Sequence, residues 1–172
     1  FVVYVKLNIK KEFLHHYQIV LKDMIPNCIS NSFFISFSDE KDEKLSKNGL
    51  SITISTHTKA VYWEGLTKEE YENKKLQTQK FIIDEFLNYF DDLYESNIKE
   101  CFCATSKTFY RYINRSNCGG KPINIKSALS LPSCNTPFEG LYNVGDTVFA
   151  GQGWPGVALG VDILNKELKT NN

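Results

Sequence analysis

The most informative part of this 172-residue sequence is the run GLYNVGDTVFAGQGWPGVALG, residues 140–160. Its start predicts a short apolar strand over residues 141–144, which stops at Gly145. Asp146 follows, and a glycine-rich loop then leads into a helix that we expect to begin at or near Trp154–Pro155, because proline suits the first turn of a helix. A strand, a glycine turn with a carboxylate and a helix N-terminus together favour a site for the phosphate or ring of a cofactor.

Glycines are unusually dense in this run. They include Gly156 and Gly160, which fall inside the predicted helix, where each costs roughly 1 kcal/mol relative to alanine. A tight connection between a strand and a helix would also need glycines, but their number here favours a cofactor role. The helix itself is predicted from one apolar stripe at the helical period: Val157, Val161, Leu164 and Leu168.

Composition narrows the class of protein. The chain has 20 Lys and Arg against 20 Asp and Glu, so no charge field directs it to nucleic acid or to an anionic membrane. No apolar run approaches the ~20 residues of a membrane-spanning helix. The first residue, Phe1, opens an apolar run without the basic start of a signal peptide, and we therefore expect a C-terminal fragment of a larger protein.

Five cysteines with scattered spacing do not form a disulfide pattern. Cys101 and Cys103 resemble half of a zinc knuckle, but no second pair at zinc spacing accompanies them. Free thiols in a reducing compartment are the favoured interpretation, and no metal site is predicted.

Upstream, alternation of apolar and polar residues predicts half-buried strands, and two of them should form an antiparallel pair around the Asn48–Gly49 turn. The expected strands cover residues 1–7, 16–21, 32–38, 50–56 and 98–104, with a short helix or turn over 10–17. Thr67 and Glu70 predict a capping box that opens a helix to about Leu93. Its expected buried face is Leu76, Ile83, Phe86, Leu87, Phe90 and Leu93. A short helical piece over 105–112 and a long loop over 114–137 complete the chain.

The quoted run resembles the C-terminal flavin motif of the phytoene desaturase and carotenoid isomerase family, FAD-dependent enzymes related to amine oxidases. Ala150 stands where that motif usually has proline, and Trp154–Pro155 replaces smaller residues. Weaker likenesses lie upstream: Trp63–Leu66 with Tyr71 and Lys74–Lys75, Thr108–Tyr112, and Ser55–Thr58. The resemblance covers most of residues 30–168, and only the last motif is highly specific.

The resemblance implies a fold class and a domain division. The fold would be α/β, here an α+β fragment, in which an antiparallel substrate-domain sheet with a long helix is followed by the closing strand–turn–helix of an FAD-binding Rossmann-like domain. Residues 1–112 would form part of the substrate domain, residues 113–139 a connecting loop, and residues 140–172 the end of the FAD domain.

The same resemblance implies which residues hold FAD. Asp146 would accept hydrogen bonds from cofactor hydroxyls, while the backbone of Gly145 and Thr147 would lie against the pyrophosphate side. The small loop would let the chain approach the flavin ring, and the helix N-terminus would stabilise negative charge there. Those loop and helix residues are Gly151, Gln152, Gly153, Trp154 and Pro155. Trp154 would border the ring or the substrate tunnel, or pack as a core tryptophan. No residue is assigned to catalysis.

The glycine fingerprint for the ADP half of FAD is absent from these residues, and Gly119–Gly120 does not replace it. The fragment alone is therefore expected to bind FAD poorly and to be inactive. His57 would line a substrate cavity or be a structural or surface histidine, and the second interpretation is favoured. Arg111 and Arg115 would anchor the loop or pack on neighbouring aromatic residues, and packing is favoured.

The leading hypothesis is thus a fragment of an FAD-dependent oxidoreductase or isomerase that acts on an apolar, carotenoid-like polyene. Peripheral membrane contact would suit such a substrate. The compartment stays open between cytoplasm and an organelle such as a plastid, and the oligomeric state is open too. Two alternatives remain: a truncated, non-catalytic binding module, and a flavin-dependent enzyme for an amine or a retinoid.

Overall fold

The computed structural model describes residues 1–116, 133–145 and 153–170. The chain divides into two compact units, Phe1–Ser116 and Asn117–Asn172.

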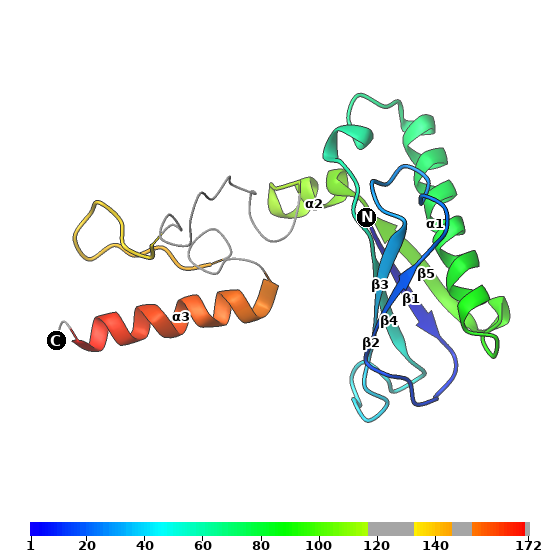
Figure 1. The fold of residues 1–172 in the computed structure, drawn as a ribbon, viewed down its shortest axis with the longest axis horizontal. Coiled ribbons are helices and arrows are strands. Elements are labelled where there is room, and N and C mark those ends of the chain that lie inside the picture. The colour runs from blue at the N-terminus through cyan, green and yellow to red at the C-terminus, as the bar shows by residue number, and fades with distance from the viewer. Residues whose placement is uncertain (117–132, 146–152, 171–172) are drawn as a thin grey trace. The chain divides into compact units, whose positions relative to one another are not determined.

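The first unit is an antiparallel sheet with one long helix on one of its faces (Figure 1). Its strand order is β2-β3-β4-β1-β5, with all neighbours antiparallel. The strands are β1 (Val2–Leu7), β2 (His16–Val20), β3 (Ser32–Phe37), β4 (Ser51–Ser55) and β5 (Ile98–Ala104). The helical elements are η1 (Ala60–Trp63), α1 (Lys68–Tyr89), η2 (Glu95–Asn97) and α2 (Ser106–Ile113). The predicted antiparallel sheet with a long helix is confirmed.

Alternation along the strands creates the core. Val3, Val5, Ile52 and Ile54 of the two central strands are at most 3 % exposed, and they lie on the face that α1 covers. Ile82 and Phe86 of α1 are completely buried against this face. Burial of such side chains contributes about 1.5–3 kcal/mol each and is the main stabilising term of this unit.

The capping box that starts α1 is confirmed, because Thr67 accepts from the backbone N–H of Glu70 and the Glu70 carboxylate accepts from that of Thr67. Two details of the prediction are wrong. Leu76 lies 58 % exposed, whereas Thr78 occupies the buried position. The helix ends at Tyr89 rather than near Leu93, because the chain leaves the helix at Phe90 to bury that ring against aromatic side chains of the sheet side.

The helix or turn expected over residues 10–17 contains no helix. The chain is irregular up to His16, where β2 begins and pairs with β3. Phe13 explains the difference, since its ring stacks on Phe37 at 4.5 Å and meets Phe90 edge-on at 5.5 Å. These aromatic contacts hold the segment without helical hydrogen bonds.

The Asn48–Gly49 turn closes the β3–β4 connection as predicted. Gly49 has a φ of +113°, a conformation that other residues rarely adopt. A Cβ at this position would lie 1.9 Å from the carbonyl oxygen of Leu7, so glycine is required where the turn packs against the end of β1.

In the second unit, α3 (Gly153–Thr170) confirms the helix predicted after the glycine loop. The strand predicted over residues 141–144 is wrong, since the described residues there make a single bridge between Tyr142 and Asn135. One bridge satisfies too few backbone groups to build a strand. Instead, Cys134 and Asn135 tie this segment to α3 by donating to the carboxylate of Glu167 at 3.3 Å each. The Rossmann-like character of this unit therefore remains a prediction.

The apolar stripe of α3 is only partly covered. Val157 and Leu164 are half-buried, whereas Val161 and Leu168 are 49 % and 37 % exposed. The predicted domain boundaries also stay a prediction, because they rest on what each part would bind.

Asn27 joins three segments of the first unit and provides a test of the packing. Its φ of +58° is in the left-handed region. The side-chain amide of Asn27 donates to Thr78 Oγ1 at 3.1 Å, and its backbone carbonyl accepts from Thr58 Oγ1 at 2.7 Å. We expect Asn27→Ala to lower the free energy of unfolding by about 2 kcal/mol, from backbone strain and the lost hydrogen bonds. Asn27→Gly keeps the backbone conformation and should lose less in urea unfolding. Equal losses for both variants would contradict a strained backbone at this residue.

Two thiols provide a test through pH. Burial raises the pKa of Cys28 and of Cys103 to about 11, from an ordinary value near 9. The folded state then holds these protons more tightly than the unfolded state, so their contribution to stability is complete below about pH 9 and is lost as the pH rises towards 11. The Cys28→Ser, Cys103→Ser double variant should lose less stability between these pH values in chemical unfolding. An identical loss would contradict the burial of the thiols.

Candidate functional site

The predicted flavin-binding residues are only partly within the described structure. Gly145, Gly153, Trp154 and Pro155 lie in it, whereas Asp146, Thr147, Gly151 and Gln152 lie outside the described residues. Gly153, Trp154 and Pro155 are consecutive in the first turn of α3, and the structure gives no contact between them and Gly145.

Two features of the described part fit a flavin site. Gly145 has a φ of +144°, and no atom of the other described residues lies within 4 Å of where a Cβ would stand. Helix α3 begins at Gly153 and has no acidic residue in its first turn. Its N-terminal N–H groups, which carry the positive end of the helix dipole, thus have no carboxylate of that turn beside them.

In the first unit, the upstream residues that resemble the family motif come together around the ring of Tyr71. The Tyr71 hydroxyl shares hydrogen bonds with Thr105 Oγ1 at 2.9 Å and Thr108 Oγ1 at 3.4 Å. Trp63 is completely buried, meets the Tyr71 ring edge-on at 6.1 Å and donates from Nε1 to Thr58 Oγ1 at 2.9 Å. We call Thr58, Trp63, Tyr71, Thr105 and Thr108 the tyrosine cluster.

The tyrosine cluster fixes the position of α2. Thr105 is the N-cap of this helix and is completely buried, and its backbone N–H donates a hydrogen bond to Thr108 Oγ1. The ammonium of Lys107 lies 5.0 Å from the centre of the Tyr71 ring and adds a cation–π contact. Residues far apart in the sequence thus hold the start of α2 against η1 and α1.

The second candidate surface is the face of the sheet opposite α1, which we call the open face. Two aromatic pairs lie on it, with ring centres 5.0 Å apart for Tyr4 and Phe102 and 5.5 Å apart for His16 and Phe34. Phe102 and Phe34 are 60 % and 44 % exposed. Between the two pairs in the strand register stand small hydroxyl side chains: Ser36, Thr53 and Ser55.

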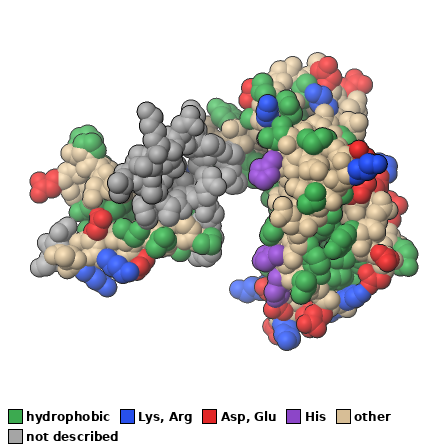
Figure 2. All heavy atoms as spheres, in the orientation of Figure 1, with side chains coloured by type: hydrophobic (Ala, Val, Ile, Leu, Met, Phe, Trp, Pro, Cys, Tyr) green, Lys and Arg blue, Asp and Glu red, His purple; other side chains and the backbone are tan. Residues whose placement is uncertain are grey.

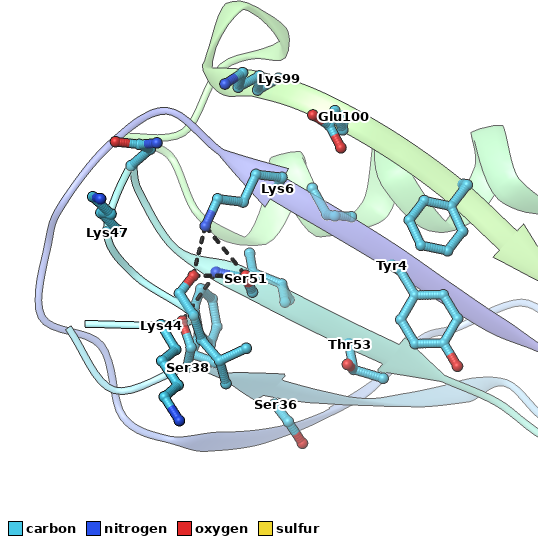
Figure 3. A pocket seen from close by; sticks show the side chains of 16 residues that line it. Tyr4, Lys6, Ser36, Ser38, Lys44, Lys47, Ser51, Thr53, Lys99 and Glu100 are labelled. Carbon is cyan, nitrogen blue, oxygen red and sulfur yellow. Dashed lines mark hydrogen bonds between the residues drawn. The ribbon is translucent and has the colours of Figure 1, made fainter. Parts of the chain in front are cut away.

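A pocket of about 770 Å³ hollows one end of the open face (Figure 3). Tyr4 and Phe102 line one side of it, and the loop between β3 and β4 lines the other. The Lys6 ammonium holds this loop by donating to the carbonyls of Leu45 at 2.6 Å and Gly49 at 3.1 Å. In the space-filling view, charged side chains of both signs gather at the lower end of this unit (Figure 2).

The remaining candidates have local roles. His57 is exposed at the end of β4, in agreement with the surface alternative. The Arg111 guanidinium lies 5.7 Å from the centre of the Tyr112 ring, in agreement with packing on an aromatic side chain. Among the described residues, no group of three or more His, Cys, Asp or Glu side chains is placed to hold a metal ion. No helix in the same residues combines the length and apolar character needed to cross a membrane.

Sequence reasoning missed the open face and the tyrosine cluster. A signal for the open face was present, since Val2, Tyr4, Phe34 and Phe102 are apolar at positions that alternate with the core residues. Strands that are apolar on both faces indicate a second covered or ligand-binding face. The tyrosine cluster had no such signal, because its hydroxyl contacts depend on the three-dimensional packing.

Removal of the Tyr71 hydroxyl tests the tyrosine cluster. We expect Tyr71→Phe to lower the free energy of unfolding by about 1 kcal/mol, because the Thr105 hydroxyl loses a part-buried partner. Tyr110→Phe is the matched control, since Tyr110 is 60 % exposed. Equal stability of the Tyr71→Phe variant and the unchanged protein in urea unfolding would show that the hydroxyl network does not hold α2.

Comparisons with known proteins find one kind of relative. A chloroplastic prolycopene isomerase from Daucus carota is 32 % identical over 150 residues, which cover 84 % of this chain and 24 % of the relative. One from Arabidopsis thaliana is 33 % identical over 150 residues, covering 84 % of this chain and 25 % of the relative. A third, from an Oncidium hybrid cultivar, is 33 % identical over 135 residues, covering 74 % and 22 %. The chain spans about a quarter of the length of these relatives. No protein-family model and no solved structure matches it.

Proposed function

Because the chain is a homologue of the prolycopene isomerases, carotenoid isomerases of the phytoene desaturase-like flavoprotein family, we propose that it is the C-terminal part of a flavin-dependent enzyme acting on a carotenoid-like polyene. The single observation that carries this proposal is the sequence identity of 32–33 % across most of the chain. The relatives are named as chloroplastic, which supports a plastid location.

We assign the flavin to the segment around Gly145 and the start of α3. When bound, FAD would supply the redox or isomerisation chemistry of the double bonds. The residues of the chain would hold it: Asp146 as an acceptor for cofactor hydroxyls, and the Gly151–Gly153 backbone as a surface without bulk. Support comes from the left-handed turn at Gly145, where no other described residue fills the place of a side chain, and from the α3 N-terminus, which has no acidic residue in its first turn. That terminus would stabilise negative charge on the ring.

The open face is our candidate for one wall of the polyene site. A conjugated hydrocarbon has flat π surfaces and no hydrogen-bonding groups, so aromatic side chains suit it. Phe34 and Phe102 offer exposed rings, and Tyr4 stacks against Phe102. The aromatic pairs lie on different strands of a rigid sheet, which would keep a long chain extended and exclude water from it.

The flavin assignment is tested at Asp146. In the full-length gene product, Asp146→Ala should lower the flavin content and the activity together, because the cofactor loses a charge-assisted hydrogen-bond acceptor. The measurement is flavin absorbance per protein after purification. Asp91→Ala is the control for loss of a carboxylate outside the flavin segment. Unchanged flavin content in the Asp146→Ala variant would remove that residue from the site.

The substrate wall is tested at Phe102. Phe102→Ala should raise the KM for a polyene about tenfold while leaving flavin absorbance unchanged, because the exposed ring contributes contact area rather than stability. Tyr94→Ala is the matched control, since Tyr94 is 63 % exposed outside the sheet. An unchanged KM in the Phe102→Ala variant would show that the polyene does not contact the open face.

A further inference from the structure

The pocket at the end of the open face has an uneven charge. Four of its sixteen lining residues are lysines, Lys6, Lys44, Lys47 and Lys99, and one is an acid, Glu100. A polyene hydrocarbon has no charge for these side chains to meet. The lysines therefore indicate a ligand feature beyond the proposed function.

The four lysines differ in what they already contact. The Lys6 ammonium already has partners, because it donates to the two loop carbonyls named above and also to Ser51 Oγ at 3.3 Å. Lys44 lies near the Asp42 carboxylate and contributes to the lowering of its pKa, after the backbone N–H groups of Leu45 and Lys44. Lys47 and Lys99 are exposed, and neither side chain forms a hydrogen bond or an ion pair with another described residue.

The loop that lines one side of the pocket is held in place. Gly49 packs against the end of β1, and Lys6 fastens the neighbouring carbonyls, so the loop segment that bears Lys44 and Lys47 is anchored on the sheet. Lys99 belongs to β5, on the other side of the pocket. Lysines of the β3–β4 loop and of β5 thus line the same pocket, and Figure 3 labels Lys47 on the loop and Lys99 on β5.

Aromatic surface adjoins these charges. Tyr4 and Phe102 line the pocket, and Thr53 and Ser36 continue its floor across the sheet. A volume of about 770 Å³ is the size of a site for one small molecule. A hollow of this kind favours a single ligand over a flat membrane surface.

We propose that this pocket binds one amphiphile with an anionic head, a carboxylate or a phosphate, and a long apolar chain. The head lies at Lys47 and Lys99, where a compact ammonium suits either group. The chain lies over Tyr4 and Phe102 and continues along the open face. Such a ligand would compete with a polyene on that face, and its binding requires no flavin.

The test compares three ligands of one chain length: oleate and oleyl phosphate, each below its micelle concentration, and uncharged oleyl alcohol, below its solubility limit. Calorimetric titration of the unchanged protein should show both anions binding at least tenfold more tightly than the alcohol. Raising NaCl from about 50 mM to about 500 mM should weaken the anions and leave the alcohol unaffected, because salt screens exposed charges. Equal affinity for the alcohol and the anions would overturn the proposal.

Charge-removal variants locate the head. Lys47→Gln with Lys99→Gln should weaken oleate roughly threefold to thirtyfold, the range expected for two exposed ion pairs. Lys22→Gln with Lys68→Gln is the matched control, since both side chains are exposed and neither lines the pocket. If both double variants weaken oleate binding equally, the anion is attracted by the overall charge of the protein, and the proposed site is wrong. Thermal melting of both variants verifies that folding is unchanged.

An experiment with lipid vesicles distinguishes the binding of a single ligand from docking on a membrane surface. The protein is sedimented with phosphatidylserine vesicles, and the Lys47→Gln, Lys99→Gln variant is sedimented in parallel. If vesicle binding depends on these lysines while monomeric oleate does not bind, the surface docks on membranes and the proposal of a single ligand is wrong. Oleate binding in a protein that lacks flavin would support the pocket and leave the flavin hypothesis to its own test. Absence of oleate binding in a flavin-loaded, active enzyme would overturn the pocket alone.

Discussion

The packing of α1 on one face of the antiparallel sheet is the constraint on which the rest of the first unit depends. Ile82 and Phe86 pack in one core cluster with alternate strand residues such as Val5 and Ile54, so this face of the sheet is buried. The other face is thereby left with aromatic, hydroxyl and lysine side chains. A ligand surface on this sheet is therefore set by the same alternation that builds the core.

The sequence predicted the elements well where local physics decides them. Alternation placed the strands, and the Thr67–Glu70 capping box placed the start of α1. Long-range aromatic packing explains the predictions that were wrong. The ring contacts of Phe13 hold an irregular segment where a short helix or turn was expected, and the packing of Phe90 ends α1 before Leu93. The strand expected before Gly145 needed a partner along its whole length, which a local pattern cannot supply. The tyrosine cluster was invisible for a similar reason, since its threonines are ordinary in sequence.

The proposed function divides between the two units of the chain. The tyrosine cluster holds α2 on the sheet, and α2 is the last element of the first unit before the chain continues towards the glycine-rich segment. The second unit offers a helix N-terminus and a turn at Gly145 where the family resemblance expects a flavin. The open face offers exposed rings for a polyene and lysines for a charged head. An anionic amphiphile bound there would compete with a polyene for the same rings.

Under the proposed function, the protein acts on a carotenoid-like polyene with the help of flavin. The most direct measurement incubates the purified, FAD-loaded full-length gene product with prolycopene, the compound named in its relatives, and separates the products by chromatography. We expect conversion to isomers of the same mass with reduced flavin, or to more desaturated products with oxidised flavin as the hydride acceptor, and no conversion without flavin. Unchanged prolycopene with flavin bound, or equal conversion without flavin, would contradict the claim.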